Sequence, residues 1–343
     1  MTYYAYLNAR VSILAERLLS EKRLTALLNQ PLSAFSHATS NEENLNDLLN
    51  DNCVEQTLIE QAWLMRMLTD FKILVRPLAG AARELLMYWF HKCDIANLKT
   101  IVRGKIAGLD SDLISAQLLE LGPLTTLPIE PLLRTEDIGE LLRRLENSPY
   151  GDIAIQARRV FEKDHQLYSL DAAIDRHYLL GFVRRVRALD TTQRQHLSPL
   201  IGIFMDRFNL LWLLRYRFAY NLSAAETYYL LVPTSYQLNR ARLQHLVELN
   251  SSTEVLEHLP EPFFSLLLDA DNTFTVEQRL TIEIRRVAEL TLKLRSFTLA
   301  KVFAYVLLRE MEMQRVMAII KGKRLNLKND IVLLAAESSS ALI

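Results

Sequence analysis

The chain has 343 residues, half of them hydrophobic, which is enough material for two or three domains with packed cores. Its 40 Lys and Arg residues balance 40 Asp and Glu residues, so the zero net charge predicts no general attraction to nucleic acid or to an anionic membrane. Arg10, Glu16 and Arg17 interrupt the N-terminal stretch, which therefore differs from a signal peptide, and no apolar run approaches the roughly 20 residues of a membrane span. We expect a soluble, cytoplasmic protein with Cys53 and Cys93 as reduced core residues.

The apolar pattern predicts an all-α chain. There are only nine glycines, and no segment alternates apolar and polar residues between turn signals as strands do. Apolar residues instead recur three and four positions apart, most clearly over 54–74, 171–189 and 277–297. In the second of these segments, one apolar stripe is formed by Ile174, Tyr178, Phe182, Val186 and Leu189.

Two breaks divide the predicted helices. The stretch LGPLTTLPIEPLL at 121–133 holds three prolines and cannot form one continuous helix, and LLVPTSY at 230–236 is a second break. Before that second break, Ser223 and Glu226 have the spacing of a capping box, so a helix should begin directly after Ser223. The breaks predict three units, 1–120, 121–233 and 234–343.

One helix pattern occurs three times, as DIANLKTIVRGK at 94–105, DRFNLLWLLRYR at 206–217 and EMQRVMAIIKGK at 312–323. Each copy starts with an acid, has apolar residues in its fifth, eighth and ninth positions, and has bases in its tenth and twelfth positions. Each copy follows one of the amphipathic segments above and precedes another helix, so the repeated unit is a bundle, longer than the roughly 34–47 residues of helical solenoid repeats.

Three similar bundles in one chain are expected to pack around a pseudo-threefold axis as a ring or funnel. The isolated chain should then be a monomer, because its internal copies supply what oligomerisation would otherwise build.

The repeated bases are the candidate functional residues. The tenth positions hold Arg103, Arg215 and Lys321, and the twelfth positions hold Lys105, Arg217 and Lys323. In one interpretation these bases cap helix C-termini and pair with nearby acids, while Gly104 and Gly322 adopt the left-handed cap conformation. In the other, the three helix ends meet around the axis and line a socket for acidic or carbonyl groups of a partner protein. The sequence leaves both interpretations open.

The order of these motifs resembles the C-subunit family of A/V-type ATPases, whose vacuolar member is called the d subunit or AC39. The resemblance is carried by YAYLNARV at 4–11, CDIANLKTIVRGKIAGL at 93–109, SPYGD at 148–152 and the two later copies of the repeated helix. It covers nearly the whole chain in the family's order. The family pattern has Asn in the fourth position of each copy, which Asn97 and Asn209 keep, whereas the third copy has Arg315. If that Asn makes a buried hydrogen bond, another bond must replace it in the third copy.

The resemblance implies an all-helical funnel of three similar domains and a non-catalytic role. The D and F subunits of the central rotor stalk would seat in the funnel, and its base would rest on the membrane ring of proteolipid subunits, on the cytoplasmic side. The protein would thus be peripheral to the membrane through its complex. It would couple the ATP-hydrolysing head to proton or sodium transport without a cofactor of its own.

The sequence lacks the common catalytic motifs, which agrees with a non-enzymatic role. The chain has no GxxxxGK[ST] or GxGxxG phosphate loop, no GxSxG elbow, and no metal-ligand spacing among its seven histidines. We therefore predict no catalytic, metal or cofactor residue. The arginine cluster at 184–187 is predicted to be a solvated helix face, and the aromatic residues of YRFAY and TYYLL to be core residues. The alternative function is a triplicated, all-helical protein-binding scaffold unrelated to ATPases.

Overall fold

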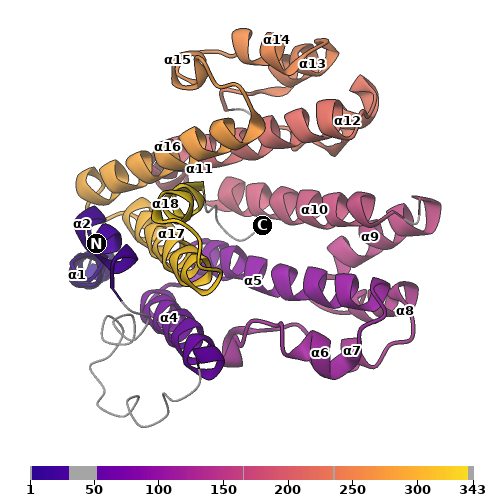
Figure 1. Cartoon of the computed structure of the whole chain (residues 1–343). Coiled ribbons are helices and arrows are strands. Elements are labelled where there is room, and N and C mark those ends of the chain that lie inside the picture. The colour runs from indigo at the N-terminus through magenta and orange to yellow at the C-terminus, as the bar shows by residue number, and fades with distance from the viewer. Residues whose placement is uncertain (1, 31–51, 165, 235, 339–343) are drawn as a thin grey trace. The chain divides into compact units, whose positions relative to one another are not determined.

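The computed structural model describes residues 2–30, 52–164, 166–234 and 236–338, and these residues form helices with no strand among them (Figure 1). The all-α prediction is confirmed. The three predicted amphipathic segments are α4 (Asn52–Val75), α10 (Leu167–Ala188) and α16 (Thr273–Leu294). The repeated patterns form the C-terminal parts of three long helices: α5 (Gly80–Ile106), α11 (Thr191–Leu214) with the π-helix η3 (Arg215–Ala219), and α17 (Leu299–Arg324).

The chain divides into two compact units. The first combines the described parts of Met1–Leu78, Thr191–Leu211 and Asn250–Ala341, and the second combines those of Ala79–Asp190 and Trp212–Leu249. The predicted boundaries between three repeats stay a prediction.

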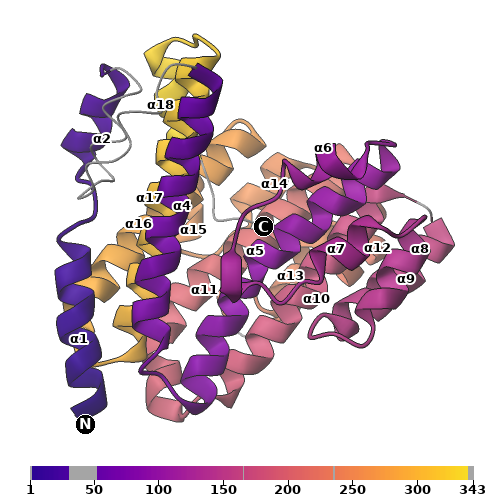
Figure 2. The same ribbon diagram turned by 90° about the horizontal axis from the view of Figure 1, so that it is seen from below.

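The first unit is built around α17, which is apolar on nearly every side and therefore buried. Its neighbours are α1 (Thr2–Ala15), α2 (Glu21–Leu28), α4, α16 and α18 (Asn329–Ser338). Figure 2 shows α1, α4 and α17 side by side. The short helices α14 (Ser252–Glu257) and α15 (Phe263–Leu267) complete this unit with most of α11. The N-terminal helices thus lie against the helix that carries the third copy.

In the second unit, α10 packs against both α5 and α9 (Gly151–Asp164). The predicted apolar stripe of α10 is buried along its whole length. The other helices of this unit are short: α6 (Ser111–Ser115), η2 (Gly122–Leu124), α7 (Ile129–Leu133), α8 (Ile138–Leu145), α12 (Ala224–Leu230) and α13 (Arg240–Glu248).

The predicted breaks and the predicted helix start are confirmed. The proline-rich stretch 121–133 contains only the short helices η2 and α7, and the second break separates α12 from α13. The side chain of Ser223 accepts a hydrogen bond from the Glu226 backbone N–H, and the Glu226 carboxylate accepts one from the Ser223 backbone N–H, which completes the capping box.

The left-handed cap at Gly104 and Gly322 was a wrong prediction. Both glycines lie inside their helices, and the left-handed residues come later, at Gly108, Asn221 and Asn326. The two glycines are needed for close packing instead. A Cβ atom at Gly104 would lie 2.5 Å from a side-chain carbon of Ile114, and one at Gly322 would lie 2.4 Å from a methyl carbon of Val332. They therefore let α6 and α18 fold back onto the repeated helices.

The effect of Gly322→Ala on the free energy of unfolding should change sign with the residue at position 332. In the wild type the new Cβ would also lie 3.1 Å from the Cβ of Val332, so overpacking of about 1–3 kcal/mol should outweigh the roughly 1 kcal/mol gained in helix propensity. In a Val332→Ala background both methyl clashes are removed, and the remaining 3.1 Å contact with the Cβ needs a shift of only a few tenths of an ångström, so the gain in helix propensity should prevail and Gly322→Ala should stabilise. Urea unfolding of the four proteins measures both effects, and destabilisation of equal size in both backgrounds would rule out this close contact as the reason for the glycine.

Burial also agrees with several other sequence predictions. Cys93 is a buried free thiol, whereas the side chain of Cys53 lies outside the described residues.

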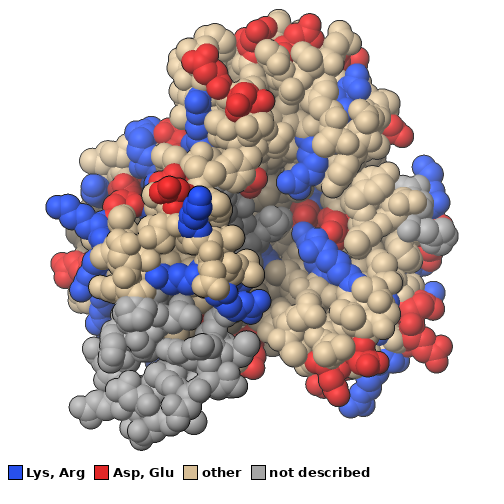
Figure 3. All heavy atoms as spheres, in the orientation of Figure 1, with Lys and Arg blue, Asp and Glu red and all other residues tan. Residues whose placement is uncertain are grey.

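Among the described residues, one helix, Thr191–Ala219, is long and apolar enough to cross a membrane, but 83% of its most apolar window is buried inside the protein, as in a core helix. Figure 3 shows basic and acidic side chains interspersed over the visible face, in keeping with the zero net charge.

Candidate functional site

The acids in the first position of the repeated pattern point into the protein. The buried carboxylate of Asp94 accepts hydrogen bonds from the hydroxyls of Thr125 and Tyr150 and from the backbone N–H of Thr126, at 3.1 Å for the last. Glu312 is also buried, where it accepts a hydrogen bond from the Leu19 backbone N–H. In the first and third copies, the acid therefore holds a neighbouring chain segment in place.

The bases in the twelfth position donate to backbone carbonyls near the C-termini of short helices. Lys105 Nζ donates to Leu133 O at 2.9 Å and to Thr135 O at 2.5 Å, which are the last residue of α7 and the second residue beyond it. Lys323 Nζ donates in the same way at the end of α2, to Leu28 O at 2.6 Å and Gln30 O at 2.7 Å.

Arg217 makes the corresponding contacts in the second copy. Its Nε donates to Val247 O near the end of α13 at 3.1 Å, and its Nη1 donates to Leu222 O at 3.2 Å. A cation suits these positions because helix C-termini carry unsatisfied carbonyls and a negative partial charge. All three twelfth-position bases are half-buried, and burial lowers the pKa of Lys323. Their donors thus cap helices of the same protein.

The bases in the tenth position are exposed in all three copies. Arg103 Nη2 lies 2.5 Å from Asp171 Oδ2, although 54% of the Arg103 side chain is accessible to solvent. The side chains of Arg215 and Lys321 make no hydrogen bond or ion pair to another described residue. Of the six predicted site residues, these three therefore keep donors available for a partner.

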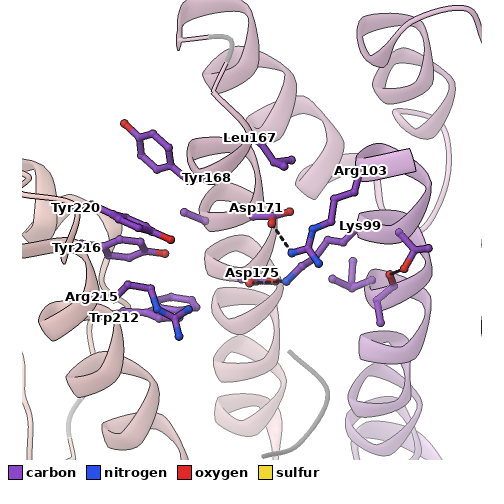
Figure 4. Close-up of a pocket in the computed structure, with 14 residues that line it drawn as sticks. Lys99, Arg103, Leu167, Tyr168, Asp171, Asp175, Trp212, Arg215, Tyr216 and Tyr220 are labelled. Carbon is purple, nitrogen blue, oxygen red and sulfur yellow. Dashed lines mark hydrogen bonds and ion pairs between the residues drawn. The ribbon is translucent and has the colours of Figure 1, made fainter. Parts of the chain in front are cut away.

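Arg103 and Arg215 line one pocket of about 740 Å³ in the second unit, and Lys321 lies in the first unit. Figure 4 shows Asp171 and Asp175 pointing from α10 toward Arg103 and Lys99 of α5. Lys99 Nζ donates to both carboxylate oxygens of Asp175, at 2.8 and 2.9 Å. The two cations are four residues apart on α5, and the two acids are four residues apart on α10. The four side chains therefore form two successive ion pairs between these helices.

The opposite side of the pocket is aromatic. Trp212 and Tyr216 are buried there, and the ring of Tyr220 lies 5.4 Å from that of Tyr168, which projects from α10 (Figure 4). Burial raises the pKa of the Tyr216 hydroxyl, so it stays protonated at neutral pH. Tyr168 and Tyr220 are 39% and 48% exposed. The prediction that the aromatic residues of YRFAY and TYYLL are core residues is therefore wrong for Tyr220, and also for Tyr229, which is 65% exposed. The pocket combines cations with an accessible aromatic rim.

Comparison with known proteins gives a match over nearly the whole chain. The family described as "ATP synthase (C/AC39) subunit" matches residues 7–333. The chain belongs to this family.

Similar members are named as the C subunit of A-type ATP synthases. The protein of Methanothermobacter thermautotrophicus is 26% identical to this chain over 94% of it and 84% of the relative. The proteins of Thermococcus kodakarensis and Methanocaldococcus jannaschii are 24% and 23% identical, over 93% and 95% of this chain and 86% and 84% of their own lengths. The resemblance inferred from the repeated motifs is confirmed.

The fourth position of the repeated pattern shows how this C/AC39 family member accommodates its departure from the expected Asn. In the first copy, the Asn97 side chain donates to Leu119 O at 3.0 Å and accepts from Leu119 N at 2.7 Å. In the third copy, the guanidinium of Arg315 donates to both carboxylate oxygens of Glu21, at 2.7 Å each. The predicted replacement bond therefore exists, and α2 at the N-terminus supplies it.

Replacing Glu21 should loosen α2. The hydrogen bond from Arg315 lowers the pKa of Glu21 below its usual 4.5, so its stabilising contribution is present above that pH and is lost as the pH falls through the lowered pKa. We expect Glu21→Gln to reduce hydrogen-exchange protection over 21–28 at neutral pH, with Glu16→Gln, a change of an exposed acid in the same segment, as control. The wild-type protection should decline on acidification, while that of Glu21→Gln should change less. Equal protection in the two variants at neutral pH would contradict this role.

Sequence reasoning found the bases but missed the groups that surround them. No motif marked Lys99, Asp171 or Asp175, and their only signal was the spacing of four residues on each of two helices. In the cluster at 184–187, Arg184 and Arg187 are exposed as predicted, whereas Arg185 is half-buried over the ring of Tyr88, 3.7 Å from its centre. Among the described residues, no cluster of His, Cys, Asp and Glu is placed to hold a metal ion.

Proposed function

We propose that this protein is a non-catalytic central-stalk component of a rotary ATPase of the A/V type. It forms a socket for the rotor shaft, made of the D and F subunits, and rests on the membrane ring of proteolipid subunits at the cytoplasmic side. Through these contacts it couples ATP hydrolysis in the head to proton or sodium transport. The observation that carries the proposal is the family match over residues 7–333, together with relatives named as the C subunit of A-type ATP synthases.

The tenth-position bases are the proposed contacts with the shaft. Arg103, Arg215 and Lys321 are equivalent in the repeat and exposed in every copy. The twelfth-position bases stabilise the helices that form the socket and do not contact the shaft, because their N–H donors already bind backbone carbonyls of the same chain. These bases are Lys105, Arg217 and Lys323. The funnel of three repeats, bounded near 120 and 233, is part of this proposal, with α2 completing the third repeat.

The rival interpretation, a protein-binding scaffold unrelated to ATPases, lacks comparable support because the chain belongs to an ATP synthase family.

Affinity purification from cells that express the whole ATPase tests the proposal. A tagged chain should bring down the D and F subunits and the proteolipid ring, and the purified chain alone should bind no ATP in calorimetry, since it has no phosphate-binding loop. Recovery of the chain without any of these proteins, while they are present in the cells, would contradict the proposal.

A further inference from the structure

The pocket of the second unit has an unbalanced positive charge. Each acid of the pocket is already paired, Asp175 with Lys99 and Asp171 with Arg103. Arg215 is the remaining charged side chain of the lining, and it is exposed, with no ion pair or hydrogen bond to another described residue. A guanidinium group without a partner at the edge of a partly enclosed pocket favours an anion. A carboxylate suits it well, because its two oxygens can accept two parallel hydrogen bonds from the guanidinium N–H groups.

The rim of the same pocket offers an apolar contact next to this charge. Tyr168 and Tyr220 are accessible and touch one another, over the buried rings of Trp212 and Tyr216. Exposed aromatic residues beside an arginine are the composition typical of the energetically important part of protein interfaces. A ligand that fits both features carries a carboxylate and an apolar group side by side.

The backbone at this pocket is also irregular, and only in this copy of the repeat. In the first and third copies the repeated helix stays α-helical to its end, with glycine in the eleventh position. In the second copy the end is the π-helix η3, and the eleventh position is Tyr216. The left-handed residue accordingly falls one position later, at Asn221, than Gly108 and Asn326 in the other copies. π-helical turns are frequent at functional sites, and this one, at the C-terminal end of α11, contributes Arg215 and Tyr216 to the pocket lining.

We propose that this pocket receives an acidic side chain of the rotor shaft, with its carboxylate paired to Arg215 and an adjacent apolar side chain of the shaft packed on Tyr168 and Tyr220. This inference rests on the proposed function, since the shaft is the partner named there. A phosphate group fits less well than a carboxylate, because Asp171 and Asp175 line the same pocket and repel a multiply charged anion. The second copy thereby becomes the specific contact, whereas the other two contribute exposed charge.

Photo-crosslinking tests this contact directly. Tyr220 is replaced by the photoreactive amino acid p-benzoylphenylalanine, and the chain is irradiated with the purified D and F pair. The matched control carries the same group at Tyr229, which is 65% exposed and lies in the same unit but outside the pocket lining. We expect a crosslink from position 220 to an acid-containing segment of the shaft, and none from position 229. Arg215→Gln should weaken shaft binding by about two- to fivefold and lower its salt dependence.

The outcomes separate this inference from the proposed function. If the shaft binds but no crosslink forms at position 220, or both positions crosslink equally, the pocket is not the contact and the proposed function survives. If the shaft does not bind the unmodified chain, the proposed function itself fails. Loss of the crosslink on addition of ATP or inorganic phosphate, without loss of shaft binding, would assign the pocket to a small anion and overturn the inference.

Discussion

A triple variant, Arg103→Ala with Arg215→Ala and Lys321→Ala, is expected to bind the D and F pair at least about tenfold more weakly than the wild type. Exposed charge-assisted contacts are individually worth about 0–1 kcal/mol, so each single variant should bind only slightly less well. Together, three losses of about half that maximum amount to about 1.5 kcal/mol, slightly more than the roughly 1.4 kcal/mol that corresponds to a tenfold change in affinity. The dependence of binding on salt should also fall, because screened contacts have been removed.

The triple variant should keep its fold, since all three side chains are exposed. A matched control replaces three other exposed bases, Arg134, Arg159 and Lys293, by Ala, and changes the net charge by the same amount. Titration of each purified variant with the shaft, beside its circular dichroism, measures both properties. Wild-type affinity in the triple variant, or equal weakening in the control, would contradict a specific role of the tenth-position bases.

The largest effect on stability is expected from Arg309→Met. The guanidinium of Arg309 is buried between α4 and α17, where it lies 3.1 Å from Asp70 Oδ2 and also pairs with Glu312. Replacing the cation leaves two buried carboxylates without this partner, and such a loss typically lowers the free energy of unfolding by about 3–5 kcal/mol. Replacing the whole cluster, by adding Asp70→Asn and Glu312→Gln, should recover much of that loss because the two buried acids are then neutral as well.

The stability deficit of Arg309→Met should depend on pH. Burial already raises the pKa of Glu312, and loss of the neighbouring cation raises it further. A group whose folded-state pKa exceeds its unfolded-state value binds its proton more readily when folded, so stability falls as the pH rises between the two values. The deficit should therefore be smaller near about pH 5 than near about pH 8. Thermal unfolding at both pH values measures it, and a deficit below about 1 kcal/mol at the higher pH would show that the cluster is not essential.

Local features of the structure could be predicted from the sequence. The existence of an amphipathic helix over most of 171–189, the breaks at 121–133 and 230–236, and the capping box at Ser223 and Glu226 each depend on residues close together in the chain. The repeated acids and bases also identified the family, because their spacing recurs in the same order.

Contacts between distant segments could not be predicted in this way. Gly104 and Gly322 looked like helix ends, but the reason for them is the approach of α6 and α18. The six repeated bases looked equivalent in the sequence, yet in the structure those in the tenth position are exposed and those in the twelfth are half-buried. Glu21, the partner of Arg315, lies 294 residues away and has no local signal. The pocket depends on η3, and the pattern of the second copy gave no sign of a π-helix.

Ion transport by the assembled ATPase tests the central claim, coupling without catalysis, most directly. The complex is reconstituted into vesicles with and without this chain, and ATP hydrolysis and ATP-driven ion uptake are measured on the same preparations. Without the chain, the head should still hydrolyse ATP while ion uptake is lost, and adding the purified chain should restore uptake. Undiminished ion uptake in its absence would contradict the account.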